Sequence, residues 1–238
     1  MRLYYDFHLH TALSPCADDD MTPNNIVCMA KLKGLDAIAI TDHNSVKNAR
    51  AAMAVGEANG VTVLPGMEIE TSEEVHVVAL FPTIEAAEQA EAAVWQALPP
   101  IDNRKEIFGN QLIIDENDMT VGEVDRMLVI ASSLSIDEVF ELARSLGGTA
   151  FPAHADRSSY SVLSNLGFIP ESLHLSHIEI SKNITDAEEY IGNTPAIKGL
   201  SVVRSSDAHR LGDIAERDNY IDVPENTAHG IIDVLSKT

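Results

Sequence analysis

The sequence predicts an α/β fold of parallel strands and intervening helices, either doubly wound or closed into a barrel. Two observations support this prediction. Short apolar runs alternate with amphipathic stretches of helical period along most of the 238 residues, which is the pattern of strand-helix-strand units. Histidine and carboxylate residues also follow several of the apolar runs, and folds of this kind place their sites at the carboxyl ends of the strands.

The N-terminal part of the chain alternates regularly between strand and helix. Strands are expected at residues 3–10, 35–41, 61–64 and 75–81, and helices at about 22–33, 45–59 and 84–97. Thr22 followed by Pro23 is a helix start signal. Gly34 and Gly60 end the first two helices, and Pro99 ends the third.

The rest of the chain begins with a segment that breaks this rhythm, and we expect an insertion at about residues 100–134. Ser135 and Glu138 then have the spacing of a capping box for a helix over residues 135–146. Strands follow at 149–153, 178–180 and 200–203, with a terminal helix that includes 231–235. Because no Gly/Ser-rich or Pro-rich linker divides the chain, residues 1–238 are expected to form one domain.

Composition limits the classes of partner. A hydrophobic content of 45% supports one large core, and 16 basic against 37 acidic residues give a formal charge of −21. This balance disfavours binding to nucleic-acid backbones, which requires clustered Lys and Arg. It is compatible with a small anionic substrate, because bound divalent ions reverse the field inside a carboxylate-lined pocket.

The cysteine content and the N-terminus favour the cytoplasm. Cys16 and Cys28 are too few for a disulfide scaffold, and no basic segment followed by an apolar core begins the sequence. No apolar run approaches the roughly 20 residues of a membrane-spanning helix. A soluble protein without membrane contact is expected, and the sequence gives no indication of its oligomeric state.

The pair His8 and His10 closes the first apolar run. Positions i and i+2 of a strand share one face, so the two imidazoles point toward a common site that suits a metal ion. The pattern recurs at the ends of later runs, in Asp42-His43, Glu68, His76, His154 and Asp207-Ala208-His209. A single buried histidine is more often a hydrogen-bonded core residue. Together, these groups would be unpaired unless a cation held them. His174, His177 and His229 lack this placement and are expected at the surface or in packing contacts.

These motifs, as an ordered set, resemble the PHP (polymerase and histidinol phosphatase) domain phosphoesterases. The matching segments are His8-Leu9-His10, Thr41-Asp42-His43, Gly66-Met67-Glu68, Val75-His76, the strand end at His154 and Ser206-Asp207-Ala208-His209. The resemblance covers most of the chain and is weakest between about residues 83 and 135. It implies a TIM-like, distorted (β/α)7 barrel with a metal site at the C-terminal ends of the strands.

The resemblance also implies the ligands of two or three divalent ions. His8, His10, Glu68 and Asp207 would hold one ion, Glu68 would bridge to a second ion completed by His76 and His154, and His43 and His209 would bind a third. The last ligand of the third ion is either Cys16 or Asp18, since the segment Ser14-Pro15-Cys16-Ala17-Asp18 departs from the family pattern.

The residue types agree with hydrolytic chemistry at phosphorus. Imidazole and carboxylate ligands suit zinc, manganese or iron, and a bridging carboxylate sets two ions at the spacing of phosphoryl-transfer sites. Asp207, His209 and Glu68 are the expected catalytic residues, and Asp6 and Asp42 are candidates for orienting ligand imidazoles. Arg157, Arg210 and Arg104 are the candidates for binding phosphate.

The sequence therefore predicts a metal-dependent hydrolase acting on a small phosphate monoester, such as a nucleotide, a sugar phosphate or a histidinol-phosphate-like compound. Two alternatives remain. An amidohydrolase-type metal barrel also uses a His-x-His pair, but it often places a bridging lysine where this chain has Glu68. A metal-binding regulatory or partner-binding module without turnover is compatible with the departure at Cys16 and Asp18.

Overall fold

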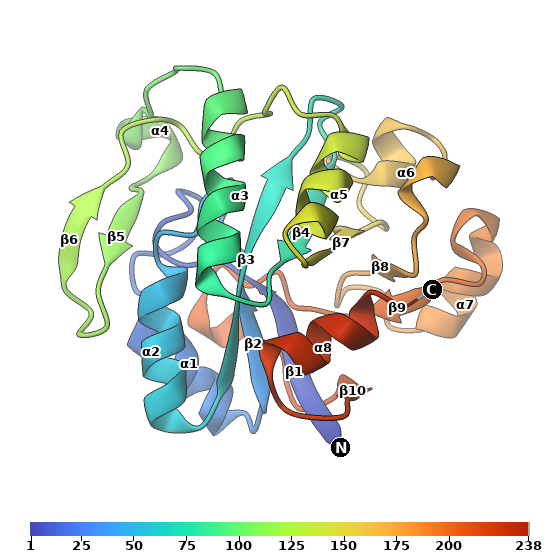
Figure 1. Cartoon of the computed structure of the whole chain (residues 1–238), viewed down its shortest axis with the longest axis horizontal. Coiled ribbons are helices and arrows are strands. Elements are labelled where there is room, and N and C mark those ends of the chain that lie inside the picture. Colours follow the sequence, from blue (N-terminus) through green and yellow to red (C-terminus); the bar gives the residue numbers. More distant parts are fainter. Residues whose placement is uncertain (238) are drawn as a thin grey trace.

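The computed structural model describes residues 1–237 and is built around a curled six-stranded sheet (Figure 1). In spatial order the strands are β10 (Tyr220–Asp222), β1 (Arg2–Leu9), β2 (Ala37–Ile40), β3 (Thr62–Glu70), β4 (His76–Leu80) and β7 (Thr149–Pro152). β1, β2 and β3 are parallel, whereas β4 is antiparallel to both of its neighbours and β10 is antiparallel to β1. The sheet is therefore mixed.

The expectation of parallel strands was wrong at β4, and the antiparallel strand β10 was not predicted from the sequence. β3 is one strand to Glu70, so Glu68 lies within it and not beyond it. Only residues 71–75 separate β3 from His76 at the start of β4. A parallel crossover needs about a dozen residues or more, whereas a hairpin needs very few. The short connection therefore produces an antiparallel pair.

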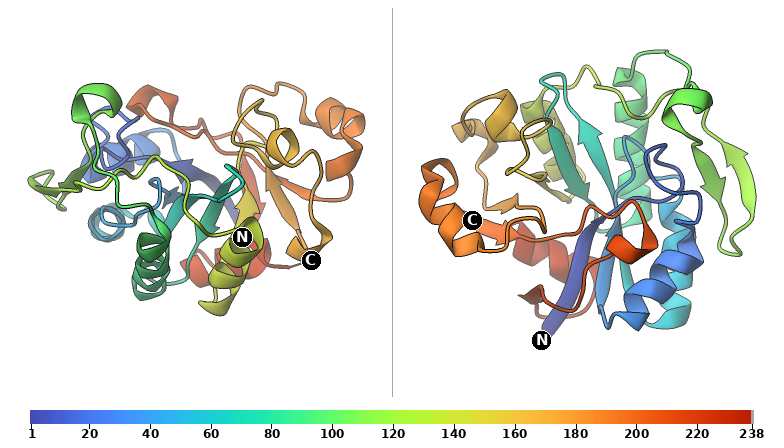
Figure 2. Two further views of the ribbon diagram at one scale, coloured as in Figure 1. Left: turned by 90° about the horizontal axis from the view of Figure 1, so that it is seen from above. Right: turned by 180° about the vertical axis from the view of Figure 1, so that it is seen from behind.

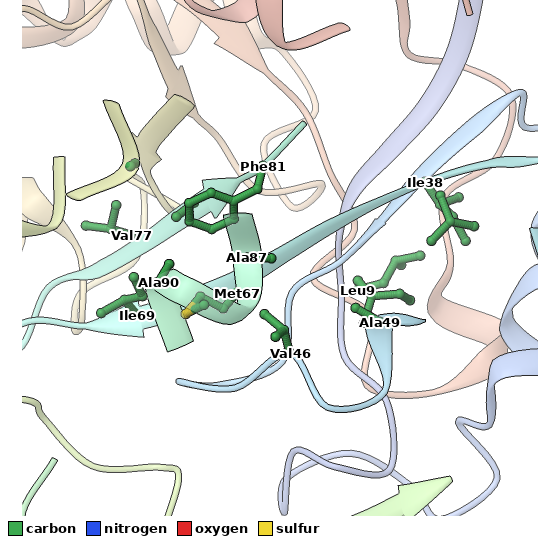
Figure 3. Close-up of a cluster of buried hydrophobic side chains, with 14 of the residues drawn as sticks. Leu9, Ile38, Val46, Ala49, Met67, Ile69, Val77, Phe81, Ala87 and Ala90 are labelled. Atoms are coloured by element: carbon green, nitrogen blue, oxygen red, sulfur yellow. The ribbon is translucent and has the colours of Figure 1, made fainter. Parts of the chain in front are cut away.

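Helices α1 (Pro23–Leu32), α2 (Ala49–Asn59), α3 (Ile84–Ala97) and α5 (Ile136–Ser145) confirm the expected helices, although α2 begins four residues later than 45. Thr22 caps α1 by accepting from Asn25 N, and Ser135 and Glu138 form the predicted capping box. The buried residues of all four helices join one hydrophobic cluster with one face of the sheet. Figure 3 shows Ala87 and Ala90 of α3 against this cluster. We call this face the outer face.

The opposite, inner face has its own core. Alternate residues of the strands, such as Phe7, Leu64 and Phe151, pack there against Ile231 and Leu235 of α8 (Ala228–Leu235). On β3, Leu64 faces inward while Val63 and Met67 face outward, so Glu68 and Glu70 follow Leu64 onto the inner face by the two-residue period of a strand. The inner face is apolar at one end and polar at the other.

The expected seven-stranded barrel does not form as a closed sheet within residues 1–237. β8 (His177–Glu179) and β9 (Ser201–Val203) are a separate parallel pair. Isolated hydrogen bonds connect the neighbourhood of this pair to the main sheet, from Ala155 N to Glu179 O (2.8 Å) and from His10 N to Ala208 O (3.0 Å). β8 and β9 are three residues long, and neither forms a ladder with a strand of the main sheet. The result is a curled half-barrel.

Residues 101–134 contain α4 (Lys105–Phe108) and a hairpin of β5 (Leu112–Ile114) and β6 (Thr120–Glu123) that extends from the side of the molecule (Figure 2). Buried Gln111 holds the chain that follows β6 in place. Its side-chain amide donates to Val124 O (2.6 Å) and Arg126 O (2.8 Å) and accepts from Leu128 N (2.9 Å). The remaining helices are α6 (Val162–Asn165), α7 (Ala187–Asn193) and the 3-10 turns Glu171–Leu173, Pro195–Ile197 and Leu211–Asp213. None of the helices described is long and apolar enough to cross a membrane.

Candidate metal centre

His8 and His10 reach the inner face because β1 changes phase near its end. Phe7 packs in the inner core, whereas Leu9 packs in the outer core. The pairing of β1 with β2 shifts register between Asp6 and Leu9, and such bulges redirect side chains next to functional sites. With Leu9 turned outward, His8 and His10 both point inward, as the i, i+2 spacing predicted.

Glu68 of β3 lies at the centre of the site and is 1% exposed. Buried imidazoles from several elements approach both of its oxygens. The distances to Oε1 are 2.9 Å from His76 Nδ1, 3.1 Å from His154 Nε2 and 3.3 Å from His8 Nε2; those to Oε2 are 3.2 Å from His43 Nδ1 and 3.4 Å from His10 Nε2. Segments distant in sequence therefore converge on one carboxylate.

Asp207 supplies a second carboxylate from the loop after β9. Its Oδ1 lies 3.2 Å from His10 Nε2 and 3.4 Å from His8 Nε2. Asp207 has φ 52° and His154 has φ 29°, a backbone region that non-glycine residues seldom adopt and that is concentrated at functional sites. The loops therefore hold these side chains at some conformational cost.

Hydrogen bonds fix which ring nitrogens of His8 and His10 face the centre. His8 Nδ1 donates to Glu179 Oε2 (2.9 Å), because an ionised carboxylate only accepts. His10 Nδ1 lies 3.0 Å from Ser14 Oγ, whose hydrogen goes to Asp42 Oδ1 (2.7 Å), so the imidazole is again the donor. The two Nε2 atoms lie 3.2 Å apart and face the carboxylates of Glu68 and Asp207. Each Nε2 atom can there hold a proton or bind a metal ion.

Asp42 and Asp6 have different roles. Asp42 orients His10 through Ser14 and also accepts from the backbone and hydroxyl of Thr11, both at 2.7 Å. Asp6 makes no hydrogen bond to an imidazole in the described chain. It accepts from Ser206 N (2.9 Å), Ser206 Oγ (2.6 Å) and Ala215 N (2.9 Å), and thereby anchors the loop that carries Asp207.

The charges of the cluster are mutually compensating. Burial alone would raise the pKa of Glu68, but the imidazoles of His76 and His8 hold this pKa well below its usual value. For His10, burial lowers the pKa and hydrogen bonds to Asp207 and Glu68 raise it, to a net value of about 9. Burial lowers the pKa of His209 to about 4. The two carboxylates thus stay ionised and demand positive charge, which a proton or a divalent ion provides.

The donor atoms meet the requirements of metal binding in overlapping groups. The groups whose ligand atoms lie within 4.8 Å of one another are His8, His10, Glu68 and Asp207; His43, Glu68 and His76; and His10, His43 and His209. His154 reaches Glu68 but belongs to none of these groups. The Nδ1 atoms of His43 and His154 are buried without a hydrogen-bond partner in the described chain, which is costly unless another ligand satisfies them. The residues fit a centre of more than one ion that shares Glu68.

Cys16 and Asp18, the alternatives for one further ligand, lie in different surroundings. Cys16 lines the pocket beside the cluster. Asp18 is half exposed and pairs with Arg210 Nε at 3.5 Å. Neither belongs to the three ligand groups. Of the two, Cys16 is the one that faces the site.

The three arginines that were candidates for binding phosphate lie in different places. Arg157 Nη2 lies 2.5 Å from Asp207 Oδ2, on the edge of the cluster. The side chain of Arg210 is 72% exposed, and Arg104 is an exposed residue before α4 whose guanidinium lies 5.9 Å from the ring of Phe108. The structure therefore brings only Arg157 to the metal centre.

A pocket of about 390 Å³ opens beside the cluster. Its lining residues are Cys16, His43, Glu68, Glu70, Glu74, His76, Val129, Ile130, Ala131, Arg157, Tyr160, Asp207 and His209. The return of the 101–134 segment thus forms one wall, through residues 129–131. Arg157 is the only lysine or arginine in this lining.

Sequence reasoning missed Glu179, Ser14, Glu70 and Tyr160. Glu179 is the last residue of β8, so the strand-end argument that found the histidines would also have found it. The partners of Ser14 and the pocket positions of Glu70 and Tyr160 follow from tertiary packing. His174, His177 and His229 lie outside the metal-binding groups, as expected.

The fold and the cluster together define an α/β protein with a multi-histidine metal centre at one end of a curled sheet. Comparison with known proteins gives the family. The PHP domain model matches residues 6–143, which is more than half of the chain, and the protein belongs to the PHP domain family.

Solved structures share the fold over nearly the whole chain. The endonuclease PfuEndoQ from Pyrococcus furiosus, described as lesion-specific, has a TM-score of 0.73 and 19% identity, over 99% of this chain and 56% of that one. A proposed metal-dependent phosphoesterase from Bifidobacterium adolescentis has a TM-score of 0.61 and 22% identity, over 92% of each chain. An amidohydrolase from Chromobacterium violaceum, solved with sulfate and no metal, has a TM-score of 0.60 and 18% identity, over 94% and 93% of the two chains.

Sequence comparison adds one curated relative. The uncharacterized protein MJ1587 of Methanocaldococcus jannaschii is 36% identical over 76 residues, which cover 29% of this chain and 44% of that protein. The matched part is thus less than half of this relative, and this chain covers about half of PfuEndoQ.

Proposed function

We propose that this protein is a metal-dependent phosphoesterase. The observation that carries the proposal is the position of Glu68, whose carboxylate belongs to two ligand groups, one with His8, His10 and Asp207 and the other with His43 and His76. A carboxylate that bridges two ions is the usual core of two-metal hydrolysis at phosphorus. Zinc, manganese and iron suit this imidazole-rich ligand set.

The residues of the chain have distinct roles in this proposal. Bound divalent ions would supply an activated water and neutralise charge on the phosphoryl oxygens. Glu68 and Asp207 hold the ligand geometry and keep the site anionic enough to retain cations. Burial lowers the pKa of His209 to about 4, so its imidazole is neutral at pH 7 and has a lone pair available as a metal ligand. Arg157 pairs with Asp207, and its guanidinium could instead pair with an oxygen of a bound phosphate.

A small phosphate monoester is the substrate class that we favour. The pocket is about 390 Å³ and its lining contains a single arginine, which suits one phosphate group better than a run of backbone phosphates. The formal charge of −21 also opposes docking of a polyanion. The complex of an Endonuclease Q with a 27-mer duplex, at a TM-score of 0.70, makes a nucleic-acid phosphodiester the second candidate.

The non-phosphatase alternatives are weaker. The structural likeness to an amidohydrolase shows the shared fold, but no lysine lines the pocket, and in this proposal Glu68 would be the bridging ligand. A regulatory module without turnover would bind metal and hydrolyse nothing. We also propose that residues 1–238 act as one domain, with residues 100–134 inserted as a pocket wall.

Metal analysis combined with a substrate comparison tests the proposal. Purified protein should contain two or three divalent ions per chain and hydrolyse p-nitrophenyl phosphate, with activity lost on chelation and restored by manganese or zinc. Faster cleavage of bis-p-nitrophenyl phosphate or of an abasic duplex would favour the phosphodiester. His10→Ala should abolish turnover in a folded chain, with His174→Ala as the matched control. Bound metal without hydrolysis of any phosphoester would overturn the proposal.

A further inference from the structure

Asn48 is the residue before helix α2, and its polar side chain is completely buried. Asparagine is favoured at this position because its side chain commonly caps the helix. The side chain of Asn48 makes no such cap hydrogen bond to α2. It contacts the β5–β6 hairpin instead, which lies beside α2 (Figure 1). The amide therefore has a role other than capping.

The backbone of β5 holds both ends of the Asn48 amide. Nδ2 donates to Leu112 O (3.0 Å), and Oδ1 accepts from Ile114 N (2.9 Å). A reversed amide would place its oxygen against a carbonyl and its NH2 group against an N–H, so only one orientation satisfies β5. The second hydrogen of Nδ2 goes to Thr11 Oγ1 at 2.9 Å. β5 thus sets the direction in which Asn48 donates toward the segment that follows β1.

The hydroxyl of Thr11 is also held in one orientation. Its oxygen accepts from Asn48 Nδ2 and from Leu13 N (3.1 Å), which occupies both lone pairs. Its hydrogen is donated to Asp42 Oδ2 at 2.7 Å. The other oxygen of Asp42 accepts from Ser14 Oγ, also at 2.7 Å. Asp42 is therefore fixed by hydroxyl groups on both of its oxygens.

The same argument fixes Ser14 and His10. Ser14 Oγ donates to Asp42 and accepts from His43 N (3.1 Å). One lone pair of Ser14 Oγ remains, and His10 Nδ1 donates to it at 3.0 Å. The imidazole of His10 then directs Nε2 toward the carboxylates of the metal centre. A continuous chain of hydrogen bonds, with every hydrogen assigned, joins β5 to a metal-binding imidazole.

We propose that Asn48 is a positioning residue of the metal centre, which transmits the placement of the inserted β5–β6 hairpin to His10. Without the Asn48 donor, the Thr11 hydroxyl could turn away from Asp42, and the support of the His10 ring would loosen. This inference rests on the metal centre of the proposed function and does not depend on which phosphoester is cleaved.

Zinc affinity, measured by competition with a chromophoric chelator, tests the inference in variants that keep every metal-binding side chain. Asn48→Ala should weaken zinc binding by about 10-fold, the lower end of the range for residues that orient metal-binding imidazoles. Thr11→Val should weaken it at least as much, and Thr11→Ser, which keeps the hydroxyl, should not. The double variant Asn48→Ala/Thr11→Val should bind zinc no more weakly than Thr11→Val alone, because both changes interrupt the same chain of hydrogen bonds.

Gln111→Ala is the matched control. Gln111 is likewise a buried amide that donates to two backbone carbonyls and accepts from one backbone N–H, but these partners are Val124, Arg126 and Leu128 of the insertion. The variant should lower stability in urea unfolding and keep the zinc affinity of the wild type. The Nδ1 proton of His10 in the zinc-loaded protein gives a second readout by NMR. It should be protected from exchange in the wild type and Gln111→Ala, and should exchange rapidly in Asn48→Ala and Thr11→Val.

Three outcomes would overturn the inference. Additive losses in the double variant would mean that Asn48 acts by another route. Wild-type zinc affinity in Thr11→Val would exclude the proposed chain of hydrogen bonds, even if Asn48→Ala did not fold. Equal losses of zinc affinity in Gln111→Ala and Asn48→Ala would mean that only the docking of the insertion matters. A wild type that binds no zinc, manganese or iron would instead refute the proposed function, so the two failures are distinguishable.

Discussion

The metal centre joins two differently built regions of the molecule. The strand-built region, residues 2–152, supplies His8, Glu68 and His76 from a hydrogen-bonded sheet, His10 from the position just after β1, and His43 from the loop after β2. The loop-built region, residues 153–219, supplies His154, Arg157, Glu179, Asp207 and His209 from loops and three-residue strands. Outside glycine, positive φ angles occur in the loop-built region at His154, Tyr160, His174 and Asp207, and in the strand-built region at Asn44, Glu74 and Asp118.

This difference indicates that the strand-built region is the rigid scaffold of the site and the loop-built region its more adjustable part. Side chains on paired strands are positioned by register, so the sheet sets the spacing around Glu68. Side chains on loops depend on individual contacts, such as Asp6 with Ser206 and Asp156 with the Ser181 backbone and hydroxyl. Ligand positions in the loop-built region should therefore be easier to perturb without unfolding the protein.

The largest effect is expected at the point where the two regions meet. Glu68→Gln keeps the shape of the side chain but removes the charge shared by two of the ligand groups. Turnover should fall by about 10³-fold or more, and elemental analysis should show the loss of at least one ion per chain. Circular dichroism should report an unchanged fold, with His174→Ala as the reference. Full metal content in Glu68→Gln would mean that the carboxylate does not bridge.

The next effect compares the two carboxylates that orient imidazoles. Within residues 1–237 the carboxylate of Glu179, from the loop-built region, hydrogen-bonds to His8 alone, whereas that of Asp42 accepts from Thr11 and Ser14 within the strand-built region. Glu179→Gln should weaken metal affinity by about 10- to 100-fold with little change in stability. Asp42→Asn should lower both the metal affinity and the stability, because the new amide NH2 group would face a hydrogen-bond donor of Thr11 or Ser14. Metal titration and urea unfolding separate the two quantities, and equal unfolding midpoints for the variants would contradict the division into regions.

The sequence predicted the strand-built region better than the loop-built one. Periodicity and capping signals placed α1, α3 and α5 nearly to the residue, since their apolar faces and N-caps are local properties. Histidine motifs at strand ends predicted the cluster around Glu68. The strand-end position marks Glu179 as a candidate, but its hydrogen bond to His8 joins residues 171 positions apart, and no local pattern encodes that pairing. The prediction of a closed barrel was wrong for the same reason: which strands pair with each other depends on segments that are distant in the sequence.

A matched pair of core truncations measures the same contrast in stability. Ile38 on β2 and Ile178 on β8 are both fully buried, but β2 is paired on both sides and β8 on one. Ile38→Ala should cost about 4–5 kcal/mol, at the upper end for such truncations, and Ile178→Ala about 2–3 kcal/mol, because the less constrained site can collapse into the cavity. Denaturant unfolding gives both values. A larger cost for Ile178→Ala would show that the loop-built region is the more rigid one.

The smallest effect concerns two serine N-caps. Ser135 begins the ten-residue helix α5 and accepts from Glu138 N, whereas Ser161 begins the four-residue helix α6 and accepts from Ser164 N. Ser135→Ala should lower global stability by about 1 kcal/mol, because α5 packs on the sheet and unfolds with it. Ser161→Ala should leave the global unfolding free energy nearly unchanged and instead speed amide exchange in residues 157–165, since a short helix at the edge opens locally. This loop carries Arg157 and Tyr160, so KM should rise while kcat changes little. An equal loss of global stability in both variants would mean that the loop-built region unfolds together with the sheet and is no separate adjustable part.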